Sequence, residues 1–481
     1  MDVKRNLSML MDFYELTMSN GYFKKEMKDE IAVFDMFYRN NPDDAAYSIF
    51  CGLDDLIDYI NNLHFDESDI TYLRSLNLFD EAFLKYLADF KFNGTIYSFK
   101  EGSVVYPYEP LITVVAPLID AQLVETALLL IINHETLIAT KANRIYLSCK
   151  GRAFSDFGAR RAHNGDAAIY GARASYIGGA SSTATTLAAK KFDIKVSGTM
   201  AHSWVMSFDS EYEAFKAYAE IYPNNAVLLI DTYDVLNQGV RNAIKVANEF
   251  LIPHGYRLKG VRIDSGDLAY LSKECRKILD EAGLNDCQIV VSNSLDEFKI
   301  KSLIEQGAKI DLFGVGENLI TSKSNPVFGG VYKLAAIKKG DELIPKIKLS
   351  ESVEKITNPG LKDVYRVYSK EGKIMADLIA IKDEELDEKN IPFVYPAKPW
   401  KDMKFEDVKL VNMRHKIFDE GKLVYKRENI EDIKRYVRHQ VDDELWEEER
   451  RFVMPHIHYL DYTTKFYELK MKLIKEHRNE R

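Results

Sequence analysis

The chain has 481 residues, a length that exceeds a single hydrophobic core and predicts two or three domains. Hydrophobic residues make up 46% and charged residues 29% of the sequence, as is typical of a soluble globular protein and not of a disordered one. The formal net charge of −9 argues against non-specific binding to nucleic acid, although it leaves room for a local basic pocket.

The first part of the chain alternates between helical and strand-like patterns. In chain order, the patterns predict a helix with a break at Gly21, a strand, a group of helices, a small antiparallel sheet and a long buried helix (residues 1–30, 31–40, 52–90, 93–118 and 119–150). We therefore expect an N-terminal α+β domain over residues 1–125.

The middle of the chain has a different rhythm, in which short apolar runs alternate with helical patterns. The runs are Ala226–Ile230, Lys259–Ile263, Gln288–Val291 and Ile310–Phe313, and the helical patterns span about 235–251, 267–282 and 296–306. Alternation at this spacing indicates parallel strands joined by crossover helices, which we assign to an α/β domain over residues 126–330. The periodicity is compatible with an α/β barrel and with an open sheet.

The last third of the chain predicts two further parts. Residues 331–382 return to strand-like patterns, and we expect them to rejoin the sheet of the first domain, which then includes about 331–385 and is discontinuous. Residues 386–481 are rich in charge and predict a mostly helical C-terminal extension without visible chemistry.

The cysteine pattern and the first residues exclude some classes of protein. The four cysteines form no CxxC pair, so neither a zinc knuckle nor a redox motif is encoded, and so few cysteines in so long a chain indicate reduced thiols. The first thirty residues lack the apolar core of a signal peptide, and the run Ala127–Ile132 is too short to span a bilayer. We expect a cytoplasmic protein with no membrane contact and no metal site of its own.

Polar residues and glycines stand at the ends of the predicted strands, namely Asp231, Asp264, Asn293 and Gly314-Val315-Gly316. In α/β barrels the catalytic groups lie at these carboxyl ends. The pair Gly314 and Gly316 can cradle a phosphate on backbone N–H groups, although a tight strand–helix turn explains it equally well. Asp264 suits ribose hydroxyls or a Mg²⁺ held by pyrophosphate, whereas Asp267 is expected to cap the next helix.

The stretch from Phe154 to Val205 differs in composition from the rest of the chain. Glycine, alanine and serine dominate it, and they let the backbone approach a ligand closely. Arg160 and Arg161 beside the ring of Phe157 suit an anionic, planar ligand, and a lone His202 stands near the end. Each feature alone is more often part of the fold, such as a small-residue helix packed on a sheet, than part of a ligand site. Their occurrence within about fifty residues favours a ligand site.

Several motifs in this stretch and elsewhere occur together in one order. They are MDFYELTMSNGYF, FSDFGARRAHNGDAAIYGARASYIGGASSTAT, GTMAHSWVMSF, LLIDTYD, GVRIDSGDL and FGVGENLITSKSNPVFGGVYKL. In this order the chain closely resembles the nicotinate phosphoribosyltransferase family over residues 12 to 334. The resemblance implies an irregular α/β barrel and the formation of nicotinate mononucleotide from nicotinate and phosphoribosyl pyrophosphate. It also implies ATP as a cosubstrate and Mg²⁺ carried by the substrate phosphates.

The resemblance further implies how nicotinate is bound. The pyridine ring lies between Phe157 and Tyr14, and Tyr14 comes from the partner subunit of a homodimer with shared active sites. Arg160 pairs with the carboxylate of nicotinate, and Arg262 lies against both nicotinate and the phosphoribosyl group. The segment 178–183 near the ring contains no carboxylate to accept from an amide, which favours the acid over nicotinamide.

The resemblance assigns the phosphate groups to two other places. Gly314 and Gly316 hold the 5-phosphate of phosphoribosyl pyrophosphate, and His202 is the histidine that ATP phosphorylates. A neutral imidazole nitrogen can attack a γ-phosphoryl group, and Thr199 is placed to stabilise its oxygens. Glu317 departs from the family pattern, which usually has threonine here, and a carboxylate beside a phosphate is unfavourable unless it points away.

Three alternatives stay open from the sequence. The first is a nicotinamide phosphoribosyltransferase. The second is a catalytically silent relative that binds phosphate or nucleotide, which Glu317 alone favours, whereas the intact His202, Arg160, Arg262 and Asp264 argue against it. The third is an unrelated α/β-barrel phosphate binder, which leaves the motif around Tyr14 unexplained.

Overall fold

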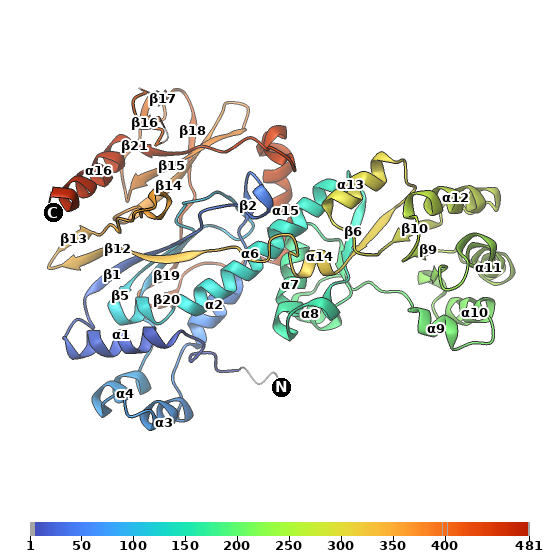
Figure 1. The fold of residues 1–481 in the computed structure, drawn as a ribbon, viewed down its shortest axis with the longest axis horizontal. Helices are drawn as coiled ribbons and strands as arrows, with labels where there is room; N and C mark the ends of the chain where they lie inside the picture. The colour runs from blue at the N-terminus through green and yellow to red at the C-terminus, as the bar shows by residue number, and fades with distance from the viewer. Residues whose placement is uncertain (1–4, 397, 402, 480–481) are drawn as a thin grey trace. The chain divides into compact units, whose positions relative to one another are not determined.

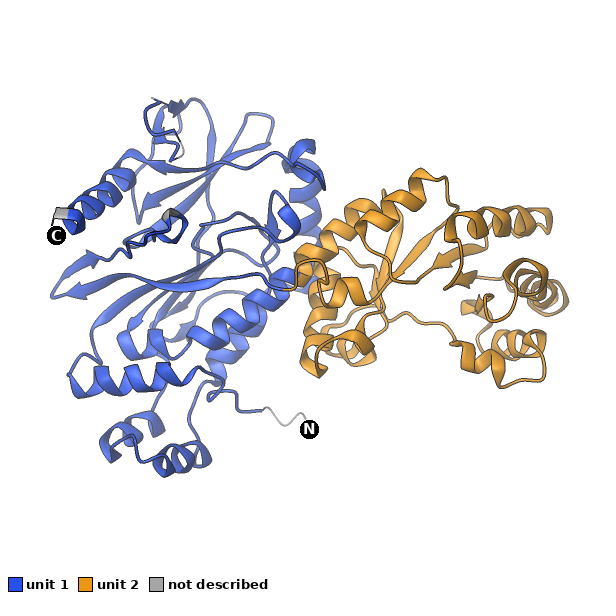
Figure 2. Cartoon of the chain, viewed as in Figure 1, with its two compact units in different colours: residues 1–137, 327–481 blue, residues 138–326 orange. Residues whose placement is uncertain are grey.

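The computed structural model describes residues 5–396, 398–401 and 403–479 (Figure 1). The chain divides into two compact units: unit 1 comprises residues 1–137 and 327–481, and unit 2 comprises residues 138–326 (Figure 2). Among the described residues, unit 1 holds two larger sheets and a two-stranded ladder of β2 (Ser48–Ile49) with β4 (Val104–Val105), and unit 2 holds one sheet.

The first sheet of unit 1 has seven strands in the order β13-β12-β1-β5-β3-β19-β20. Their bounds are Glu342–Pro345, Val331–Lys339, Ile31–Phe37, Ile112–Pro117, Thr95–Ser98, His415–Asp419 and Lys422–Leu423. The predicted strand near residue 31 is β1, which pairs antiparallel with β5 and β12. Because β12 follows unit 2 in the sequence, the chain returns to its first sheet.

The N-terminal helices follow the sequence-based prediction with one correction. Four helices are present: α1 (Phe13–Lys24), α2 (Leu53–Asn62), α3 (Glu67–Ser75) and α4 (Glu81–Ala88). The predicted break at Gly21 is wrong, because α1 continues through this exposed glycine, at which φ is not positive. A glycine inside a helix costs only about 1 kcal/mol relative to alanine, which the packed face of a helix readily offsets.

The long helix expected over 119–150 is two helices, α5 (Leu118–Gln122) and α6 (Glu125–Ser148). By length and composition alone, the span Leu118–Ser148 is long and apolar enough to cross a membrane. It extends well beyond the apolar run Ala127–Ile132 that was considered from the sequence. However, 67% of its apolar window is buried inside the protein, as in the core helix of a globular domain. Burial therefore accounts for its apolar character.

The second sheet of unit 1 corrects two expectations. Its order is β17-β16-β21-β15-β14-β18, with bounds Met403–Phe405, Ile391–Val394, Leu460–Thr463, Ile374–Ile381, Lys362–Tyr368 and Lys409–Asn412. Thus β14 and β15 do not rejoin the first sheet as predicted. The helical extension expected over 386–481 is not confirmed either, because strands β16 to β21 accompany the helices α15 (Ile430–His439) and α16 (Thr464–Asn479) there.

These strands escaped the sequence analysis for a physical reason. β17 to β20 have two to five residues and each contain a lysine, so none presents an apolar run long enough for a local strand signal. Their partners are remote in sequence: β19 pairs with β3, and β21 pairs with β15. Tertiary pairing therefore decides their conformation.

A buried charge cluster joins the second sheet to the strand β4. Arg366 on β14 and Asp377 on β15 are both fully buried, and the guanidinium donates to both carboxylate oxygens at 2.9 and 2.7 Å. Arg366 also donates to the carbonyl of Val104 at 2.8 Å. Because both charges lie away from water, each depends on the other for compensation.

The sheet of unit 2 is parallel throughout, in the order β7-β6-β11-β10-β9-β8. The bounds are Ser182–Thr183, Ala153–Asp156, Leu312–Val315, Gln288–Val291, Gly260–Ile263 and Val227–Leu229. The four apolar runs predicted as strands are confirmed as β8 to β11, and the mixed α/β class with them. The closed, irregular barrel stays a prediction.

Helices connect the strands of this sheet, and one more follows its last strand, β11. Those with regular α-geometry are α7 (Gly165–Gly178), α8 (Thr186–Phe192), α9 (His202–Met206), α10 (Glu211–Ile221), α11 (Val240–Val246), α12 (Leu268–Glu281), α13 (Glu297–Glu305) and α14 (Glu317–Ile320). Asp267 accepts from the backbone N–H of Tyr270 at 3.0 Å and caps α12, as its position in the sequence predicts. The carboxyl ends of the parallel strands consequently share one edge of the sheet.

Candidate active site

The predicted residues of unit 2 follow strands that are neighbours in its sheet. Phe157 comes directly after β6, Gly314 lies in the buried part of β11, and Arg262 lies on β9. Ser292 follows β10, which lies between β9 and β11 in the sheet. The order of the strands therefore brings together residues that are up to 157 positions apart in the sequence.

Phe157 and Gly314 are in direct contact. The backbone N–H of Phe157 donates to the carbonyl of Val315 at 2.8 Å, which places its ring over Gly314. A Cβ atom at Gly314 would lie 2.5 and 2.6 Å from two carbons of this ring. Glycine is therefore needed here to leave space for the ring, which is a reason that the sequence alone did not provide.

Arg262 connects four of the site residues. Its Nε donates to Ser292 Oγ at 3.1 Å, and its Nη1 donates to Thr199 Oγ1 at 3.2 Å. Its Nη2 lies 3.4 Å from Asp264 Oδ1, and its guanidinium carbon lies 5.5 Å from the centre of the Phe157 ring. Ser292 in turn donates to Asp264. The guanidinium is thereby held in a fixed orientation beside an aromatic face.

Asp231 and His202 form a second group at the same edge of the sheet. Asp231 Oδ2 accepts from the backbone N–H of Asp264 at 2.9 Å and from Ser265 Oγ at 2.7 Å. Asp231 Oδ1 is buried, has no hydrogen-bond partner within the described part of the chain, and lies 3.9 Å from His202 Nε2. His202 Nδ1 shares a hydrogen bond with Thr232 Oγ1 at 3.1 Å. The hydrogen bond to Thr232 orients the imidazole, and its other nitrogen faces the Asp231 carboxylate.

The loop after β6 carries the two arginines. Arg160 and Arg161 lie in a short 3₁₀ turn (Ala159–Arg161), and both side chains are exposed. Arg161 Nε lies 3.7 Å from Glu317 Oε2, and Lys323 Nζ lies 2.6 Å from Glu317 Oε1. Lys323, through its hydrogen bond and charge, and Arg161 lower the pKa of Glu317 below its usual value. Glu317 therefore stays ionised between two cations.

Asp156 is a site residue that the sequence analysis missed. It ends β6 and is fully buried, with Oδ1 accepting from the backbone N–H of Gly158 and Oδ2 accepting from Thr183 Oγ1, both at 2.8 Å. Burial raises the pKa of this carboxyl. Its signal was present, since it is one more acid at the end of a parallel strand, but the short strand Ala153–Asp156 lacks an apolar run.

Tyr14 belongs to unit 1. It lies on α1 with 43% of its surface exposed, and burial of the hydroxyl together with the charge of Glu125 raises its pKa. Its predicted contact with nicotinate from a partner subunit therefore stays a prediction.

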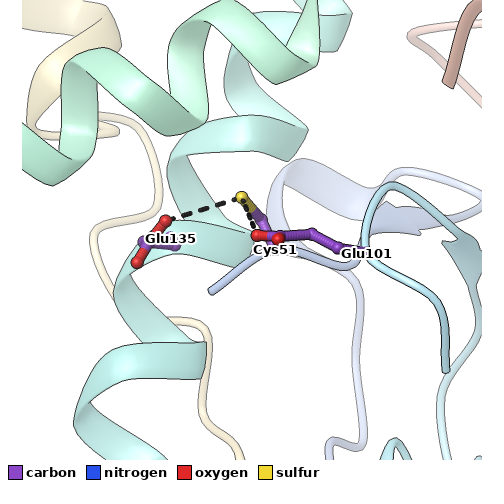
Figure 3. Close-up of side chains that lie close together, drawn as sticks. All are labelled: Cys51, Glu101 and Glu135. Atoms are coloured by element: carbon purple, nitrogen blue, oxygen red, sulfur yellow. Dashed lines mark hydrogen bonds between the residues drawn. The ribbon is translucent and has the colours of Figure 1, made fainter. Parts of the chain in front are cut away.

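Within the described residues, unit 1 also holds a group of atoms of the metal-ligating type (Figure 3). Cys51 Sγ, Glu101 and Glu135 are buried, and their ligand atoms lie within 4.8 Å of one another. The thiol donates toward Glu101 Oε1 at 3.4 Å and toward Glu135 Oε2 at 3.7 Å, and Gly52 N–H donates to Glu101 at 2.8 Å. These hydrogen bonds account for the arrangement as part of the core.

Known families and structures resemble the chain along almost its whole length. Models of the N-terminal domain, the family domain and the C-terminal domain of nicotinate phosphoribosyltransferase match residues 9–133, 152–370 and 361–470. The nicotinate phosphoribosyltransferase of Bacillus subtilis is 42% identical over 98% of this chain and 96% of its own. That of Dictyostelium discoideum is 34% identical over 90% and 82%. The crystal structure of human nicotinic acid phosphoribosyltransferase has a TM-score of 0.86 and 26% identity, covering 96% of this chain and 99% of that chain.

Proposed function

The chain belongs to the nicotinate phosphoribosyltransferase family, and we propose that it joins nicotinate to phosphoribosyl pyrophosphate in NAD salvage. The products are nicotinate mononucleotide and pyrophosphate. The observation that carries this proposal is the family match over nearly the whole chain, together with the contact of Arg262 with Phe157, Thr199 and Asp264. The protein is an enzyme that acts on small molecules.

Nicotinate binds against the ring of Phe157 in this proposal. The ring lies on Gly314 and beneath the guanidinium of Arg262, so one apolar face and one cation are already arranged for an anionic aromatic ligand. Arg160 pairs with the nicotinate carboxylate, because its exposed guanidinium can make a bidentate contact with both carboxylate oxygens. Tyr14 of a second copy covers the other face, which makes the enzyme a homodimer.

The transfer step requires positioning and charge neutralisation more than covalent chemistry. The pyridine nitrogen attacks C1 of the ribose as the C1–pyrophosphate bond breaks, and pyrophosphate leaves with its Mg²⁺. Gly314 and Gly316 hold the 5-phosphate in this proposal, and Asp264 binds the ribose hydroxyls. The carboxylate oxygens of Asp231 and Asp264 are also the ligand type that Mg²⁺ prefers, so they fit an ion carried by the substrate.

ATP acts through His202 in this proposal. An imidazole nitrogen attacks the γ-phosphorus, ADP leaves, and water later cleaves the N–P bond. Asp231 supports this role, since its buried Oδ1 faces His202 Nε2 and can stabilise the ring when it becomes cationic. Thr199 Oγ1 accepts a hydrogen bond from Arg262, and this contact links the phosphorylation site to the substrate-binding arginine.

The acid is favoured over nicotinamide by the state of Asp156. This carboxylate lies behind the segment 181–183, but each of its oxygens already accepts a hydrogen bond, from Gly158 and from Thr183. Because Asp156 is also fully buried, it presents no exposed oxygen to the amide nitrogen of a bound ligand. A competition assay with equal nicotinate and nicotinamide is expected to yield the acid mononucleotide.

The finer features of the fold and the assembly are also part of this proposal. The parallel sheet of unit 2 belongs to an irregular α/β barrel over residues 126–330. The N-terminal domain is discontinuous, since β12 and β13 return to its first sheet after residue 330. The enzyme works in the cytoplasm.

The experiment that tests the proposal follows protein label and product together. The enzyme is incubated with γ-labelled ATP, with and without nicotinate and phosphoribosyl pyrophosphate. Acid-labile label on the wild type but not on His202→Ala, together with nicotinate mononucleotide, supports both the reaction and the phosphohistidine. Product without label removes the ATP coupling through His202 and keeps the transferase. Neither label nor product refutes the proposal and favours a silent relative.

A further inference from the structure

Glu317 lies beside the loop to which the proposed function assigns the 5-phosphate. It directly follows Gly316, whose Cα lies close to the carbonyl of Phe157, so a Cβ there would meet this oxygen at 3.1 Å. The adjacent loop carries Arg160 and Arg161 and packs against α14, because a Cβ at Gly158 would lie 2.5 Å from Ile320 Cβ. A negative charge therefore stands among the cations that surround the glycine turn.

The charge of Glu317 is offset by two cations within unit 2. Lys323 Nζ lies 2.6 Å from one carboxylate oxygen, and Arg161 Nε lies 3.7 Å from the other. The side chains of Lys323 and Glu317 are 64% and 40% exposed, so such a pair adds little to folding stability. The effect of these ion pairs is electrostatic, because a carboxylate whose two oxygens face cations repels a nearby phosphate less than an unpaired carboxylate does.

The backbone around Ser322 directs Lys323 toward Glu317. Ser322 is fully buried and has a φ of 43°, a left-handed conformation that is uncommon for serine. Its hydroxyl donates to the carbonyl of Asn325 at 2.9 Å, and its N–H donates to the carbonyl of Leu319 at 3.1 Å. This tight turn reverses the chain after α14 and returns Lys323 to the start of the helix.

We propose that Lys323, assisted by Arg161, is a positioning residue that neutralises Glu317 and thereby sets the affinity of this loop for the 5-phosphate of phosphoribosyl pyrophosphate. The inference rests on the proposed function. Lys323 acts through Glu317 and not by direct contact with the phosphate. Removing the lysine alone therefore leaves the carboxylate beside a dianion with only Arg161 to offset it, whereas removing both side chains leaves neither the carboxylate nor the need for the lysine.

The test is a double-mutant cycle on the whole enzyme. Lys323→Ala, Glu317→Thr and the double variant are compared with Lys301→Ala, which removes an exposed lysine from a different ion pair, with Glu305. Initial rates give the KM for phosphoribosyl pyrophosphate and for nicotinate, and calorimetry gives the Kd for ribose 5-phosphate, which carries the same phosphate. Thermal unfolding checks that each variant is folded.

Lys323→Ala is expected to raise the KM for phosphoribosyl pyrophosphate and the Kd for ribose 5-phosphate about fivefold at low salt. The KM for nicotinate changes less than twofold, and the double variant returns to within twofold of Glu317→Thr. An equal loss in both backgrounds, or no loss in either, overturns the inference. Binding of ribose 5-phosphate without turnover refutes only the proposed reaction, and the Kd values still decide the role of Lys323. A wild type that does not bind ribose 5-phosphate overturns the inference directly.

Discussion

The contact between Phe157 and Gly314 leads to a prediction that joins packing to substrate binding. In Gly314→Ala the new Cβ would lie 2.5 and 2.6 Å from two carbons of the Phe157 ring and 3.2 Å from Ser292 Cβ. Ordinary carbon contacts are about 3.5–4.0 Å, so the ring has to retreat by about 1 Å. The aromatic face offered to nicotinate and the contact with Arg262 at 5.5 Å are then both disturbed.

The size of the effect follows from the cost of overpacking. Inserting one methyl group into a packed site costs about 1–3 kcal/mol, and 1.4 kcal/mol corresponds to a factor of about ten in an equilibrium constant. If the ring must return to its original place to bind nicotinate, the KM for nicotinate rises between about fivefold and a hundredfold. The KM for phosphoribosyl pyrophosphate changes less, since the added carbon points toward the ring.

The assay compares Gly314→Ala with Gly165→Ala, whose added Cβ meets no heavy atom of the described chain within 4 Å. Initial rates give both KM values, and thermal unfolding reports the strain. A third variant, Gly314→Ala with Phe157→Ala, removes the clash and is expected to unfold at the same temperature as Phe157→Ala. Additive losses of stability, or an unchanged KM for nicotinate in Gly314→Ala, would refute the reasoning.

Three further predictions concern stability. Gly21→Ala stabilises α1 by about 0.5–1 kcal/mol in urea unfolding, because the added Cβ meets open space among the described residues; a loss contradicts this. Asp377→Asn leaves Arg366 buried without its carboxylate and lowers the free energy of unfolding by about 3–5 kcal/mol. Adding Arg366→Met to this variant is expected to recover part of the loss, and a double variant as unstable as Asp377→Asn contradicts this. Burial raises the pKa of Asp461 to about 7, so ionisation destabilises the folded state increasingly from about pH 4 to 7. The free energy of unfolding of Asp461→Asn therefore exceeds that of the wild type by at most about 4 kcal/mol at pH 8 and by much less at pH 5. A difference that does not depend on pH contradicts this prediction.

Local patterns predicted much of unit 2. The strands β8 to β11 were predicted because each is a short apolar run, and such runs are buried wherever the sheet places them. The helices between them were visible because their apolar residues recur at helical spacing. Both signals are local, because they depend only on residues that are close together in the sequence.

The weakly apolar strands were decided by tertiary pairing. β6 has only four residues and ends in an aspartate, and β17 to β20 are two to five residues long and each contain a lysine, so neither group has a clear local signal. They are strands because partners such as β11 and β3 supply the backbone hydrogen bonds.

The sequence by itself determined the family, the α/β class and the residue types of the site, since motifs and apolar spacing are properties of the chain. Only the tertiary structure decided which side chains meet: Phe157 on Gly314, Arg262 between Thr199 and Asp264, and Lys323 on Glu317. The physical reason is that these contacts depend on strand order and on turns with unusual backbone angles. Both arise when distant segments are packed together, and local spacing does not encode them.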